Sequence, residues 1–161
     1  MRIEIDIREV ARYMKLGTAP LEGDLLARVQ TLIAEAPVDA RGVWSADGDR
    51  IYLCGTIGVR FDQWQRRLSV GSAADALISQ AIGATAVEAV MDALEAEAKT
   101  ATPGEWGPRR SPGYGTMPLA ESAAILTRLD ATKRIGVACT ADYLLVPTKS
   151  VTAVCRKGGS R

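Results

Sequence analysis

The sequence predicts an α+β fold, with helices packed against an antiparallel β-sheet. Apolar residues recur every three to four positions over residues 72–99, as they do along the buried face of a helix. Two pairs of apolar, β-branched runs lie elsewhere, at residues 42–59 and 137–155. Short runs joined by tight turns pair as antiparallel hairpins, and helices interspersed with such hairpins indicate the α+β class.

The first part of the chain is predicted to hold helices and a hairpin. Residues 7–16 and 25–36 each carry an apolar stripe at helical spacing, and these helices end at Gly17 and Pro37. Residues 42–59, GVWSADGDRIYLCGTIGV, are two extended runs around Asp-Gly-Asp, which is typical of a hairpin turn. A polar helix, DQWQRRLSV, is expected soon after the hairpin.

The longest predicted helix covers residues 72–99. Ser72 precedes its first apolar position and can cap the first turn. Gly83 lies in the interior, where glycine costs about 1 kcal/mol relative to alanine. We therefore expect close packing or a kink at this glycine.

The rest of the chain is predicted to contain a loop, a helix and two strands. A loop over residues 101–118 leads into a helix over residues 118–136, with Pro118 in its first turn and Gly136 past its end. The two runs within residues 137–155 are separated by Pro-Thr-Lys-Ser. We expect both runs to pair with the earlier hairpin.

Composition indicates one ordinary globular domain over residues 1–161. Of its residues 47% are apolar and 24% charged, and the formal net charge is +1, so nothing favours nucleic acid or an anionic membrane as a partner. The longest unbroken apolar run is short, which predicts no membrane span. The first residues, MRIEIDIREV, lack the apolar stretch of a signal peptide, so we expect a cytoplasmic protein.

Residue types narrow the chemistry further. The chain has no histidine, which argues against a zinc hydrolase and against a Ser-His-Asp enzyme. Cys54, Cys139 and Cys155 form no Cys-x-x-Cys pair and lie among apolar neighbours. We interpret them as free cysteines that act as small hydrophobic residues; the alternative is a reactive or metal-bound thiol. No metal site and no catalytic residue is assigned.

The segment RRSPGYGTMPL, residues 109–119, is either a plain connection between helices or a rigid ligand loop. Pro112 fixes its own φ, and Gly113 lets the backbone approach a ligand closely. Arg109 offers a planar fork for a carboxylate, and Tyr114 offers a ring face for an adenine or a sulfonium. A small zwitterion that carries an aromatic base would fit this set.

The motifs RRSPGYG, RIGV, TADY and VPTKSVTAV resemble the activation domain of cobalamin-dependent methionine synthase, most nearly its short stand-alone relatives. The resemblance covers residues 50–157; residues 1–49 would supply the N-terminal helices and first strand, and residues 158–161 a tail. It places Lys133 at a helical lysine of the family and assigns matching turn and strand positions to three residues: Pro147, Ser150 and Val151.

The resemblance implies a twisted antiparallel sheet with packed helices, and a site for S-adenosylmethionine or a related ligand. Glu88, in AVEAVMDALE, matches a family glutamate that reaches the ligand; the alternative is a side chain that is solvated or paired with an N-terminal arginine. The site residues implied in this way are Glu88, Arg109, Ser111, Pro112, Gly113 and Tyr114.

The implied role is that of an accessory part of a methyltransferase system rather than a complete enzyme. In the family, the methyl group of S-adenosylmethionine remethylates cob(II)alamin, with an electron from a flavodoxin-type donor. The expected partner is therefore a separate corrinoid-binding or methyltransferase protein, which would supply the cobalamin. The identity of that partner and the oligomeric state stay open.

Two departures from the family pattern favour other readings. The family's Asp-Trp-Thr-Pro segment is absent, and Cys155 and Arg156 stand where the family has aromatic residues. A self-sufficient small enzyme could have reused the pocket, with candidate groups at Glu88, Tyr114, Tyr143, Lys149 and Cys155. A structural subunit with a vestigial pocket is a third reading.

Overall fold

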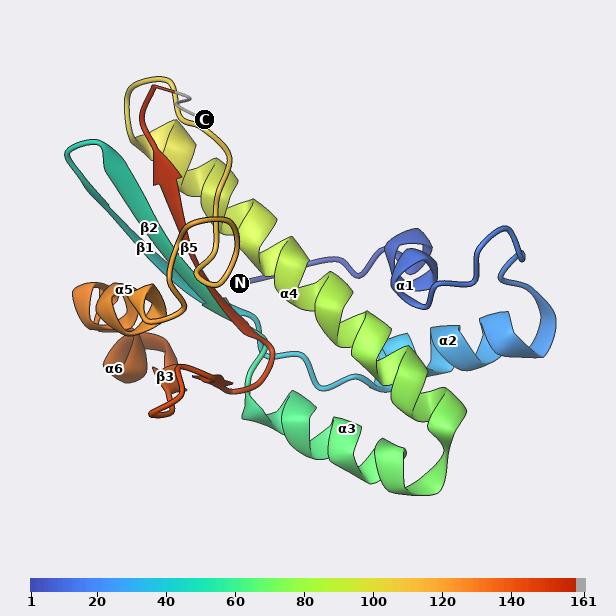
Figure 1. The fold of residues 1–161 in the computed structure, drawn as a ribbon. Helices are drawn as coiled ribbons and strands as arrows, with labels where there is room; N and C mark the ends of the chain where they lie inside the picture. Colours follow the sequence, from blue (N-terminus) through green and yellow to red (C-terminus); the bar gives the residue numbers. More distant parts are fainter. Residues whose placement is uncertain (159–161) are drawn as a thin grey trace.

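The computed structural model describes residues 1–158, and its centre is a three-stranded antiparallel sheet with helices on both faces (Figure 1). Strands β1 (Arg41–Asp47) and β2 (Arg50–Thr56) form the predicted hairpin. Strand β5 (Ser150–Arg156) pairs with the other edge of β2, so the order is β1-β2-β5. The predicted α+β class is confirmed. The expected tail lies, apart from Gly158, outside the described residues.

Helix α4 (Ala73–Ala101) lies along one face of this sheet (Figure 1). The Ser72 hydroxyl accepts a hydrogen bond from the Asp75 amide at 3.2 Å, so the predicted cap is confirmed. Gly55 of β2 lets the helix approach, because a Cβ there would lie 2.8 Å from Val90 Cγ1. The close packing expected at Gly83 is also confirmed, since a Cβ there would lie 2.8 Å from a ring carbon of Phe61.

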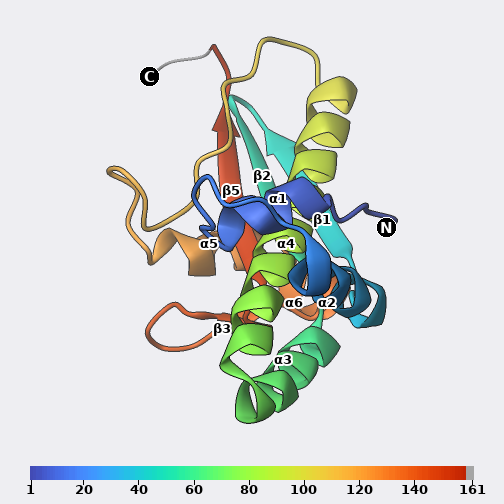
Figure 2. The same cartoon turned by 90° about the vertical axis from the view of Figure 1, so that its right-hand side faces the viewer.

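Three further helices pack against α4: α1 (Ile7–Tyr13), α2 (Gly23–Glu35) and α3 (Val59–Gly71). Figure 2 shows them gathered around its N-terminal half. By length and composition alone α4 is apolar enough to cross a membrane, although polar residues interrupt its apolar stretch. In the fold, 61% of that apolar stretch is buried, so these side chains build the larger of two hydrophobic cores.

The opposite face of the sheet carries α5 (Glu121–Leu129) and α6 (Ala131–Ile135), which enclose the smaller core. The sequence predicted one continuous helix here. That prediction was wrong, because Asp130 adopts a left-handed conformation, with φ 50° and ψ 40°, and separates the two helices. An aspartate tolerates this conformation better than most residues with a Cβ.

The pairing predicted for residues 137–155 was right only for the second run, which is β5. The first run folds on itself as a separate ribbon of β3 (Ala138–Cys139) and β4 (Leu145–Val146). A tight turn reverses the chain: the Thr140 amide donates to the Leu144 carbonyl at 2.9 Å, and the Thr140 hydroxyl accepts from the Leu144 amide at 3.2 Å. These two bonds close the turn that joins β3 to β4.

Candidate functional site

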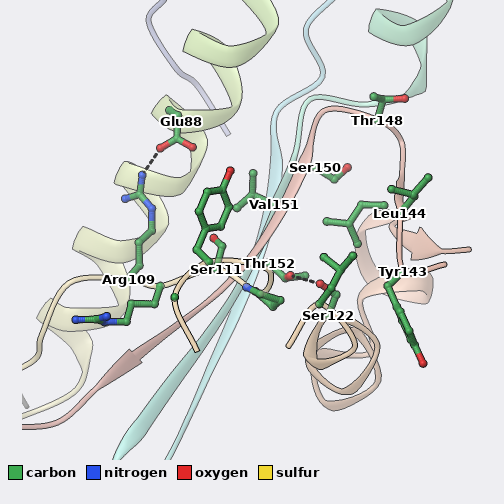
Figure 3. Close-up of a pocket in the computed structure, with 16 residues that line it drawn as sticks. Glu88, Arg109, Ser111, Ser122, Tyr143, Leu144, Thr148, Ser150, Val151 and Thr152 are labelled. Atoms are coloured by element: carbon green, nitrogen blue, oxygen red, sulfur yellow. Dashed lines mark hydrogen bonds and ion pairs between the residues drawn. The ribbon is translucent and has the colours of Figure 1, made fainter. Parts of the chain in front are cut away.

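A cavity of about 590 Å³ lies where α4, β5, the turn after β3 and the start of α5 face the segment 109–115 (Figure 3). The residues that line it are Glu88, Arg109, Arg110, Ser111, Pro112, Tyr114, Gly115, Leu119, Ser122, Tyr143, Leu144, Leu145, Thr148, Ser150, Val151 and Thr152.

The segment is held against β5 by backbone hydrogen bonds. Arg110 and Val154 exchange both of their N–H···O bonds at 2.9 Å, as a residue of a neighbouring strand would. Beyond this bridge the chain turns back, and the Gly113 amide donates to the Met117 carbonyl at 2.9 Å. Gly113 has φ +88°, a value that residues with a Cβ rarely adopt. One end of the loop is therefore fixed on the sheet.

The guanidinium of Arg109 is bound by three carboxylates of α4. One terminal nitrogen donates to Asp92 at 2.7 Å and to Glu95 at 2.6 Å, and the other donates to Glu88 at 2.6 Å. Burial by itself would lower the pKa of Arg109, but these hydrogen bonds outweigh it and raise the pKa above the ordinary value. The arginine is a fixed cation, and a ligand carboxylate would have to share it with α4.

The carboxylates of this cluster outnumber its cations. Glu95 also accepts a hydrogen bond from Lys99 Nζ at 2.5 Å, so within residues 1–158 the ion pairs of Glu88, Asp92 and Glu95 are with Arg109 and Lys99. Burial would raise the pKa of Glu95, yet Lys99 and Arg109 together hold it below its ordinary value. The side chain of Glu88 is 43% exposed, so this end of the cavity presents a negatively charged group to a guest.

Hydroxyl groups form the opposite wall. Ser122 of α5 and Thr152 of β5 are hydrogen bonded to each other at 3.2 Å (Figure 3). The Ser150 hydroxyl donates to the Pro147 carbonyl at 2.7 Å or to the Thr56 hydroxyl at 2.8 Å. A hydroxyl both donates and accepts, so this wall can bind polar edges of a ligand without adding charge.

Aromatic rings stand at the rim rather than on the last strand. Tyr114 is 77% exposed. Tyr143 has φ +62°, and its ring points away from Glu88 in Figure 3. The two positions matched to family aromatics lie elsewhere: Cys155 is buried with its sulfur 4.0 Å from Glu95, and Arg156 lines a second cleft.

Five residues implied by the resemblance line one cavity, and the sixth, Gly113, makes the turn beside it. Glu88 is also ion-paired, but its partner is Arg109, further along the chain, rather than the N-terminal arginine of the alternative interpretation. Sequence reasoning missed the hydroxyl wall, although Ser150 and Thr152 are polar residues two apart in an apolar strand and must share a face. It also missed the partners of Arg109, although Glu88, Asp92 and Glu95 have the spacing of one helical stripe.

Two groups considered for catalysis lie outside this lining. Burial raises the pKa of Cys155 to about 11, so it is a thiol at neutral pH, as expected of a free, buried cysteine. The Lys149 ammonium donates to the Gln80 side chain at 2.8 Å, and burial lowers its pKa although Asp62 opposes this. Of the five candidate groups named for a self-sufficient enzyme, Glu88, Tyr114 and Tyr143 line the cavity.

Known proteins resemble this chain in structure but not in a detectable match of sequence. No family model matches the chain, and no curated protein matches it. Among solved structures, the chain is similar to a crystal structure of the MetH reactivation domain bound to AdoHcy, with a TM-score of 0.70 at 15% sequence identity. The match covers 96% of this chain and 76% of that one. This chain therefore has the fold of the MetH reactivation domain, as its resemblance to methionine synthase activation domains led us to expect.

Proposed function

We propose that this protein binds S-adenosylmethionine, or a related adenosyl ligand, in the cavity beside segment 109–115. In this role it serves a separate, cytoplasmic corrinoid-dependent methyltransferase as an activation-domain-like accessory protein. One observation carries the proposal: Glu88, Arg109 and Tyr114, chosen by the resemblance, come together at one cavity in a fold whose solved neighbour holds AdoHcy.

The chemistry of the cavity suits such a guest. A volume of about 590 Å³ is within the usual range for small-molecule sites. The exposed ring of Tyr114 offers a face for an adenine, and the Ser122 and Thr152 hydroxyls suit a ribose. The surplus negative charge around Glu88 favours an ammonium or a sulfonium, and Arg110, which also lines the cavity, can meet a carboxylate.

The corrinoid-binding partner would supply the metal, and a separate donor would supply the electron. In the proposed role the adenosyl ligand gives its methyl group to the reduced corrinoid of the partner, and a flavodoxin-type donor provides the electron. The residues of this chain only hold the ligand and aim it, so no acid-base group is needed. This agrees with a cavity built from an ion-pair cluster, hydroxyls and backbone.

Calorimetric titration with S-adenosylmethionine and AdoHcy tests the ligand. We expect both to bind, whereas adenosine alone and methionine alone should bind at least about tenfold more weakly, because each lacks half of the contacts. Tyr114→Ala should weaken binding about fivefold, since a stacked ring contributes on the order of 1 kcal/mol, and Tyr114→Phe should restore it. The absence of binding at millimolar concentrations of both adenosyl compounds would refute the proposal.

The accessory role has its own test. A corrinoid-carrying methyltransferase, isolated in its cob(II)alamin form, is mixed with S-adenosylmethionine, a one-electron reductant and this protein, and methylcobalamin is followed by absorbance. We expect methylation to depend on this protein and to fall with Tyr114→Ala in step with ligand affinity. Binding without any such dependence would leave a ligand-binding protein and remove the accessory role.

A further inference from the structure

A second cleft, of about 450 Å³, lies on the other side of the segment that walls the first cavity. Arg110 and Tyr114 line both. The remaining lining residues of the second cleft are Arg50, Tyr52, Thr116, Met117, Pro118, Glu121, Val154 and Arg156. Three arginines thus meet at one small cleft, from strands β2 and β5 and from the ligand segment.

The register of the sheet places these arginines together. Arg50 and Arg156 are directly opposite each other on β2 and β5, so their side chains leave the same face. Val154 lies two residues before Arg156 and shares that face, and the paired backbone bonds set Arg110 directly across from Val154. The cross-strand pair Arg50–Arg156 and the neighbouring cross-strand pair Arg110–Val154 therefore lie on one face of the sheet, and all three guanidinium groups project from that face.

This arrangement concentrates positive charge. Like charges directly opposite each other on neighbouring strands destabilise a sheet. Glu121 is the carboxylate among the lining residues, and Asp49 lies 3.8 Å from Nε of Arg50. Within residues 1–158, Arg110 and Arg156 make no ion pair. Within the described residues, Asp49 and Glu121 therefore offset the positive charge of this cluster only in part.

We infer that this cleft binds a small phosphorylated anion, of the diphosphate or phosphate-ester class, beside the adenosyl cavity, with which it shares Arg110 and Tyr114. Planar guanidinium forks match phosphate oxygens in pairs, and three of them suit an anion with two or more charges better than a single carboxylate. Met117, Pro118 and Val154 add apolar walls that can receive an organic group attached to the phosphate.

Inorganic pyrophosphate and ADP, titrated calorimetrically at constant ionic strength, test the inference and distinguish a free anion from a nucleotide-borne one. Arg50→Gln/Arg156→Gln is compared with Arg66→Gln/Arg67→Gln, which removes the same charge from two exposed arginines of α3. We expect at least about tenfold weaker binding of pyrophosphate in the first double variant and less than about twofold in the second, because only the first removes contacts.

Three results would overturn the inference: no binding of either probe, equal weakening in both double variants, or unchanged binding in the first. The stability of the first variant is checked by urea unfolding, and Arg156→Gln alone replaces it if folding suffers. AdoHcy binding is measured in parallel and should be unchanged in these variants, since Arg50 and Arg156 do not line the adenosyl cavity. If no phosphate compound binds but AdoHcy does, this inference fails and the proposed function stands. If AdoHcy does not bind but pyrophosphate does, the proposed function fails and this inference stands.

Discussion

Arg109 and Arg110 are neighbours in sequence but have opposite electrostatic surroundings. Successive residues of an extended segment project to opposite sides, so Arg109 faces α4 while Arg110 faces the side of α5. Arg109 is 18% exposed and held by three carboxylates, whereas Arg110 is exposed and makes no ion pair within residues 1–158. The same residue type is a structural group on one side and an available cation on the other.

This contrast assigns different tasks to the two clefts. On the α4 side, charge is already balanced or slightly negative, so the cavity suits a guest with a positive centre and many polar edges. On the α5 side, Arg50, Arg110 and Arg156 outnumber the nearby carboxylates of Asp49 and Glu121, so the cleft suits an anion. The segment between them, through Arg110 and Tyr114, belongs to both sites.

The largest effect is expected from removing the balanced arginine. Arg109→Gln leaves Glu88, Asp92 and Glu95 close together without their shared cation. Because Arg109 and Glu95 are mostly buried, we expect a loss of about 2 kcal/mol in the free energy of unfolding, between the values for exposed and fully buried pairs. Urea unfolding measures it.

Arg110→Gln is the matched control for that change. It removes the same charge one residue away, at a side chain without an ion pair, so the free energy of unfolding should change by less than about 0.5 kcal/mol. Equal destabilisation by the two substitutions would contradict the contrast between the two sides of the segment.

Much of the fold could be predicted because periodicity and turn residues carry it. The helical stripe over residues 72–99, its Ser72 cap and the Asp-Gly-Asp hairpin all follow from local chemistry. The break at Asp130 could not be predicted, since the apolar spacing continues through it. The separate β3–β4 ribbon could not be predicted either, because the sequence of a short apolar strand does not indicate which strand it pairs with.

The sequence indicated individual residues of the candidate site but not the contacts between them. Pro, Gly, Arg and Tyr in one segment indicated a ligand loop, and five of the six implied residues do line a cavity. The engagement of Arg109 depends on how α4 is rotated against a segment 14 to 21 residues further along the chain. The second cleft depends on strand register, which pairs Arg50 with a residue more than a hundred positions away. Neither the ion pairs of Arg109 nor the second cleft can be predicted from local sequence.

Acidic pH should remove the contribution that Glu95, on the α4 side, makes to the free energy of unfolding. Lys99 and Arg109 hold the pKa of Glu95 below its ordinary value of 4.5 despite burial, so its ionised form stabilises the folded state. That stability is present above pH 4.5 and is lost as the pH falls through the lowered pKa of the folded state. We expect Glu95→Gln to cost about 1 kcal/mol at pH 7, and we expect this difference from the unmodified protein to shrink as the pH falls below 4.5. Urea unfolding across this pH range measures it, and a constant difference would contradict the assignment.

The smallest effect is expected from reversing a charge in the second cleft. Arg156→Glu would place an opposite charge directly across from Arg50, on a strand pair where like charges now face each other. Opposite-charge pairs at such positions contribute roughly 0.2 to 1 kcal/mol, so we expect the free energy of unfolding to rise by about 0.5 kcal/mol, with Arg156→Gln in between. Pyrophosphate binding should be lost at the same time. A gain in stability together with lost anion binding would mean that the cluster is maintained for its ligand at the expense of the sheet, whereas a loss of stability would show that the arginines are not in electrostatic conflict.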